Sequence, residues 1–134
     1  MKKISLCGLL VAAAIILTAA GAAAQEKADP SKVVGAWTID VYAGDTTYVL
    51  KLVVTVTDGH LEGKISETMG AFADVPLGDL FYDGQSFRFS FVSPTPPDGL
   101  ARTVKADFKV GMDKMDGAIS VPDLEMSVEA KATR

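Results

Sequence analysis

The chain has 134 residues, of which 49% are hydrophobic and 22% are charged, and it carries a formal net charge of −4 at pH 7. One domain of this length excludes a two-domain enzyme, a long solenoid and a protein with several membrane spans. Acidic residues outnumber basic ones by 17 to 13, so nucleic acid and anionic membrane surfaces are poor partners.

The first 24 residues have the pattern of an export signal. Two lysines at positions 2 and 3 precede an apolar stretch at 4–17, and small residues at 22–24 suit cleavage before Gln25. The apolar stretch is shorter than the ~20 residues that a spanning helix needs. We therefore predict a cleaved signal peptide at 1–24, no membrane span in the mature chain, and a periplasmic or secreted location.

The chain after the signal contains no cysteine, because Cys7 is the only one. Small exported domains often depend on disulfides, so we expect the core alone to stabilise this one. Residues 25–32 read as a flexible lead, in which Asp29 and Pro30 suit the start of a helical turn. Residues 33–134 are then expected to form one domain.

From Gly35 onward apolar and polar residues alternate, which is the period of a half-buried strand. The alternation occurs eight times between turn residues, and the fourth occurrence, at 75–82, is irregular because Pro76 and Gly78 suggest an edge or a bulge. Eight short strands joined mostly by tight turns predict an all-β fold, an eight-stranded antiparallel up-and-down β-barrel. A two-sheet sandwich is the alternative architecture.

One connection is long and rich in proline, at residues 93–99. Three prolines in seven residues do not suit a central strand, so we expect an exposed loop there. This loop is a candidate interaction surface, and its candidate residues are Pro94, Pro96, Pro97 and Asp98.

Several short motifs resemble those of the lipocalins and the wider calycin group. Gly35-Ala36-Trp37 is similar to the G-x-W signature at the start of the first lipocalin strand. Small lipocalin-like domains of secreted bacterial proteins also share the further patterns D-G-x-L-x-G, F-x-F, D-x-M-x-G and a final A-x-R. Here these patterns fall at 58–63, 87–89, 113–117 and 132–134.

This resemblance implies a small β-barrel that closes at its base. In lipocalins the motif tryptophan lies beneath an arginine from near the last strand, so the resemblance implies a barrel-closing pair of Trp37 and Arg134, in cation-π contact. A frayed C-terminal residue in solvent is the alternative for Arg134. The chain departs from typical lipocalins in having no room for their long helix and no disulfides.

The sequence offers few groups for catalysis. The single histidine, His60, lies beside the Asp58-Gly59 turn, and no phosphate loop, H-E-x-x-H or C-x-x-C pattern is present. Acidic residues near 74–83 and 113–123 lack the spacing of a calcium loop, so surface turns explain them better. We expect no enzyme activity, no cofactor and no metal site.

The inward faces of the strands are almost entirely apolar, which suits a hydrophobic ligand in the barrel mouth. A core filled by its own side chains is the alternative. The candidate ligand-binding residues are Trp37, Leu52, Val54, Phe87, Phe89, Phe91, Phe108, Met126 and Val128.

These observations favour an exported, monomeric, lipocalin-like binding protein whose partner is a small hydrophobic molecule. The alternative is a protein-interaction module, such as a protease or lysozyme inhibitor, with a packed core and a site on the 93–99 loop that binds another exported protein. A third hypothesis is an autonomous copy of a domain otherwise appended to secreted hydrolases.

Overall fold

The computed structural model describes residues 29–134, so the expected signal peptide and the first part of the lead lie outside the described residues. The described chain begins with a short 3-10 helix, η1 (Pro30–Lys32), which Asp29 caps by accepting a hydrogen bond from the Ser31 amide at 3.0 Å. No helix within 29–134 is long and apolar enough to cross a membrane.

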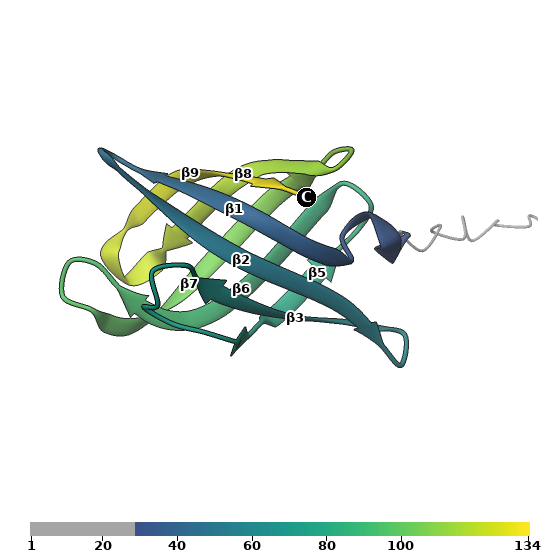
Figure 1. The fold of residues 1–134 in the computed structure, drawn as a ribbon, viewed down its shortest axis with the longest axis horizontal. Helices are drawn as coiled ribbons and strands as arrows, with labels where there is room; N and C mark the ends of the chain where they lie inside the picture. Colours follow the sequence, from purple (N-terminus) through teal and green to yellow (C-terminus); the bar gives the residue numbers. More distant parts are fainter. Residues whose placement is uncertain (1–28) are drawn as a thin grey trace, which may run out of the picture.

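The rest of the described chain is a meander of antiparallel strands, as the alternation of apolar and polar residues predicted. The strands form one sheet in the order β4-β3-β2-β1-β9-β8-β7-β6-β5. Because β1 pairs with both β2 and β9, the sheet curls into a nearly closed barrel, which excludes the two-sheet sandwich (Figure 1). The bounds of the strands are β1 (Gly35–Ala43), β2 (Thr46–Thr57), β3 (His60–Glu67), β4 (Val75–Pro76), β5 (Gly78–Tyr82), β6 (Ser86–Thr95), β7 (Leu100–Val110), β8 (Lys114–Val121) and β9 (Met126–Thr133).

The described chain has nine strands rather than the eight expected, because the irregular fourth strand is divided. Its first part, β4, pairs with β3, and its second part, β5, pairs with β6. Leu77 separates them, and its amide donates to the Gly63 carbonyl at 2.9 Å. The segment therefore changes partner halfway along, and this change leaves the barrel nearly closed.

A second difference concerns the start of the last strand. Leu124 is apolar and lies two residues before Met126, yet it belongs to the short 3-10 helix η2 (Pro122–Leu124) and not to the strand. Glu125 then takes a left-handed conformation with φ of 50°, and β9 starts at the next residue. The proline favours a helical first turn over an extended one at this point.

One half of the barrel interior is packed solid around the single tryptophan. The Trp37 indole is 1% exposed and donates to the Val33 carbonyl at 2.8 Å. The largest fully buried side chains around it are Val33, Ile39, Leu52, Val54, Ile65, Phe87, Phe108 and Met115.

A row of aromatic rings on β6 runs from this packed half toward the other end of the barrel. The ring centroids of Phe87 and Phe89 are 5.3 Å apart, and those of Phe89 and Phe91 are 6.2 Å apart. Phe91 in turn contacts Phe72, with a centroid distance of 5.8 Å. The row therefore connects the packed core with the loops.

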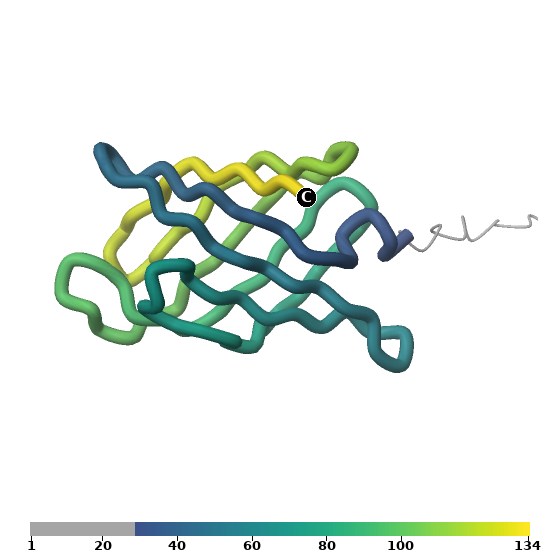
Figure 2. The backbone as a smooth tube through the Cα atoms, in the orientation of Figure 1, coloured from purple at the N-terminus to yellow at the C-terminus, as the bar shows by residue number. Residues whose placement is uncertain are grey.

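The backbone tube shows that several connections gather toward one end of the barrel (Figure 2). They are the β1–β2 turn, the loop between β3 and β4, the β6–β7 hairpin and the segment around η2. The η1 turn lies toward the opposite end. The candidate site described next is formed at the end where the connections gather.

Candidate functional site

A cavity of about 840 Å³ occupies the loop-bearing end of the barrel. Its volume lies within the ~300–1,000 Å³ typical of pockets for small organic molecules. Apolar side chains from six strands of the barrel form its wall, and they include Val41, Leu50, Phe91, Val104, Ile119 and Val128.

The connections supply the rim of the cavity. Met69, Ala71 and Phe72 come from the loop between β3 and β4, and Pro96 and Pro97 come from the β6–β7 hairpin. Met69 is 89% exposed, so the cavity has a rim in contact with solvent. A hydrophobic cavity with such a rim can take up a ligand without unfolding the barrel.

The nine residues expected to bind a ligand are divided between the two halves of the interior. Phe91, Met126 and Val128 line the cavity. The other six side chains are at most 2% exposed and belong to the hydrophobic core: Trp37, Leu52, Val54, Phe87, Phe89 and Phe108. Only one half of the expected interior is therefore open.

Glu67 is the lining residue that the sequence analysis missed and that differs most from its neighbours. It is 8% exposed at the end of β3, and its side chain lies on the wall of the apolar cavity. The two-residue alternation of the third strand could have revealed it, because Ile65 faces inward and Glu67 follows two residues later, on the same face.

The local backbone fixes the position of Glu67. Its amide donates to the Phe72 carbonyl at 2.9 Å, and its carbonyl accepts from the Gly70 amide at 3.1 Å. One carboxylate oxygen, Oε2, accepts from the Ala71 amide at 3.0 Å, whereas Oε1 receives no hydrogen bond from the described residues. One oxygen therefore holds the loop, and the other remains available.

The proline-rich connection differs from the exposed loop that was expected. Residues 93–95 belong to β6, where Thr95 pairs with Leu100 and Pro94 pairs with Ala101. Ser93 and Thr95 are buried, so the true connection is only residues 96–99. Pro94 is tolerated in this strand because β5 pairs with β6 no further than Ser90, which leaves the later part of β6 with a partner on one side only.

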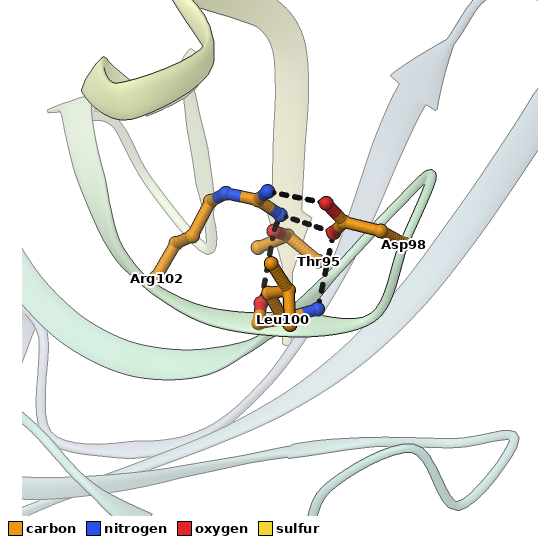
Figure 3. Close-up of polar contacts among 4 residues, drawn as sticks. All are labelled: Thr95, Asp98, Leu100 and Arg102. Atoms are coloured by element: carbon orange, nitrogen blue, oxygen red, sulfur yellow. Dashed lines mark hydrogen bonds and ion pairs between the residues drawn. The ribbon is translucent and has the colours of Figure 1, made fainter.

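A bidentate ion pair braces this hairpin (Figure 3). The Arg102 guanidinium donates to the two Asp98 carboxylate oxygens at 2.6 Å and 2.7 Å, and also to the Thr95 hydroxyl at 2.8 Å. Bonding to Arg102, and secondly to the Leu100 amide, lowers the pKa of Asp98 to about 2. Asp98 is therefore ionised throughout the physiological pH range, and the hairpin is held in one geometry at the cavity rim.

The structure places Arg134 over Trp37, with the guanidinium carbon 4.6 Å from the ring centroid. The same guanidinium donates to the Asp113 carboxylate at 2.9 Å and to the Val34 carbonyl at 2.9 Å. These partners hold the C-terminal residue in place across the packed half of the barrel, away from the cavity.

Groups suited to catalysis are sparse in the described chain. His60 is exposed at the β2–β3 turn, and no group of three or more His, Cys, Asp or Glu side chains within 29–134 could hold a metal ion. Asp83, one of the turn carboxylates, accepts from the Gln85 and Ser86 amides, which is the bonding of an ordinary turn.

Comparison of the chain with family models, with curated proteins and with solved structures finds no match. The resemblance to lipocalin-like domains therefore depends on its short motifs.

Proposed function

We propose that this chain is an exported binding protein that holds a small hydrophobic molecule in the open half of its barrel. The observation that carries the proposal is the cavity of about 840 Å³, to which six strands contribute apolar side chains. Most of its lining residues are apolar, and burying apolar surface contributes roughly 25 cal/mol per Å² to binding. A lipocalin-like mode of binding agrees with this arrangement.

Position also supports the proposal. The packed half, centred on Trp37, supplies stability, so the open half can stay unfilled without loss of the fold. A braced hairpin at the rim keeps the entrance defined before a ligand arrives, and such preorganisation lowers the entropy cost of binding.

Titration with Nile red, a neutral dye that fluoresces in apolar surroundings, tests the proposal. A Val128→Trp variant fills the cavity from β9, and we expect it to weaken dye binding by about ten-fold or more, equivalent to ~1.4 kcal/mol. Ser127→Trp is the matched control, because Ser127 is the exposed neighbour on the same strand. Equal dye binding by both variants, with circular dichroism showing folded protein, would contradict the proposal.

The alternative function is binding of another exported protein at the 96–99 hairpin. The brace between Asp98 and Arg102 favours it, since a rigid protruding hairpin loses little entropy on contact with a partner. A pull-down from periplasmic extract that recovers one partner with the native hairpin, and not with an Asp98→Ala variant, would support this alternative.

A further inference from the structure

The polar side chains of the cavity are few, and only one of them is charged. Among the described residues that line it, only Tyr48, Glu67, Ser93 and Thr95 carry polar side chains, and none is Lys, Arg or His. Thr95 already accepts from Arg102 and donates to the Leu100 carbonyl. Glu67 is therefore the one charged side chain among the described residues that line the cavity.

The geometry of Glu67 suits recognition of a donor. Its Oε2 is committed to the Ala71 amide, which fixes the carboxylate on the wall, and Oε1 takes no hydrogen bond from residues 29–134. A charged acceptor in apolar surroundings forms stronger hydrogen bonds than it would in water. A ligand that donates to Oε1 would therefore gain more than one that only fills space.

Two aromatic rings line the same cavity. Phe72 and Phe91 are in contact at 5.8 Å, and both contribute to the wall or rim. Phe72 is also tied to Glu67, whose amide donates to its carbonyl. Aromatic faces attract cations, so the rings and the carboxylate favour the same kind of ligand group.

None of the lining residues that the structure describes would neutralise an anionic ligand. Arg102 reaches the lining residue Thr95, but both of its terminal nitrogens bond to Asp98, and that carboxylate balances its charge. A fatty-acid carboxylate in this cavity would face Glu67 with no cation from the described lining residues to offset the repulsion.

We propose that the cavity selects hydrophobic amines, with the ammonium group bound to Oε1 of Glu67 beside Phe72 and Phe91, and the hydrocarbon part in the apolar end. This inference rests on the proposed binding function and narrows its ligand class. Because a protonated amine is a cation with donor hydrogens, it can donate a hydrogen bond to the carboxylate and contact an aromatic ring at the same time.

Three probes of equal chain length test the inference: octylamine, 1-octanol and octanoate, each displacing Nile red at pH 7 and constant ionic strength. We expect octylamine to bind about ten-fold or more tightly than octanoate, as one charge-assisted hydrogen bond provides. In Glu67→Gln the amide oxygen still accepts from Ala71, but the charge is gone. The preference for octylamine should then fall to about two-fold or less. Octanol is uncharged and its hydroxyl can accept from the new amide, so its affinity should change by no more than about two-fold and reports an intact cavity.

Glu62→Gln is the matched control, because it removes an exposed carboxylate from the same strand, and it should keep the full preference. Octanoate binding as tightly as octylamine, or an amine preference that survives in Glu67→Gln, would overturn the inference alone, provided that octanol binds. Failure of all three probes to bind the native protein would overturn both the inference and the proposed binding function.

Discussion

One residue, Arg134, holds together several segments at the end of the barrel opposite the cavity. Arg134 has four partners there: the Trp37 ring, the Asp113 carboxylate and the carbonyls of Ser31 and Val34. Its side chain is 27% exposed, so water screens the ion pair only in part. The last residue of the chain thus connects η1, β1 and the β7–β8 turn.

Replacing Arg134 should measurably destabilise the fold. We expect Arg134→Ala to lower the free energy of unfolding by about 1–2 kcal/mol, from the loss of the cation-π contact and the hydrogen bonds. Denaturation in urea measures the change. Arg134→Lys should recover part of it, because a lysine can still lie over the ring but lacks the planar fork that bonds two partners. No change in Arg134→Ala would mean that the residue is frayed in solution.

Two glycines of the short motifs show that the sequence can identify a constrained position without showing what constrains it. A Cβ at Gly117 would collide with the Asp107 carbonyl oxygen, and one at Gly63 would lie 2.6 Å from Leu77 Cδ1. Gly117 therefore needs glycine because neighbouring backbone approaches closely, whereas at Gly63 the flexible end of Leu77 can shift and the Val53 carbonyl oxygen, 3.1 Å away, sets the tighter limit. The motifs marked the positions, but the reason lies on neighbouring strands that the sequence does not identify.

Among the elements, the alternation of apolar and polar residues was sufficient to predict the inward face of a strand where both sides of that strand are paired in one register. The second strand illustrates this, because Leu52 and Val54 were expected inward and are buried in β2. It was insufficient where pairing changes partner, as at Leu77, or stops on one side, as at Pro94. Proline is excluded only from strand positions that are paired on both sides, and the sequence does not show where the neighbouring strand ends.

The β6–β7 hairpin should show a pH dependence centred on Asp98. Its folded pKa of about 2 lies below the ordinary value of 3.8, so the ionised form favours the folded hairpin. That contribution is complete above about pH 4 and is lost as the pH falls through about 2. Carboxyl-carbon NMR measures the titration directly.

An Arg102→Gln variant should raise the pKa of Asp98 toward 3.8, because Arg102 is the largest cause of the depression. Asp83 serves as an internal control. Its pKa is lowered mainly by the backbone amides of Ser86 and Gln85, so its titration should not move in the variant. If Asp98 titrates at the same pH with and without Arg102, the ion pair does not form in solution.

For the whole molecule, the sequence identified the inward faces but not how far each residue lies along the barrel. Phe87, Phe89 and Phe91 share one face of β6, yet only Phe91 reaches the cavity. Depth depends on the stagger between strands and on where the loops fold, and both follow from pairing across the chain. The period of the sequence therefore predicted a hydrophobic interior without distinguishing its packed half from its open half.

This division into two halves predicts that stability and binding are separable. Phe87→Ala removes a fully buried ring and should cost about 3–5 kcal/mol of unfolding free energy. Phe72→Ala removes a half-buried ring at the cavity rim and should cost about half of that or less, because the cavity already adjoins it. The order reverses for Nile red, whose affinity should fall in Phe72→Ala and stay within about two-fold of the native value in folded Phe87→Ala. Urea denaturation and dye titration on the same two variants check both orders. If both variants lose stability and dye affinity in parallel, the interior behaves as one unit and the open half is not an independent binding site.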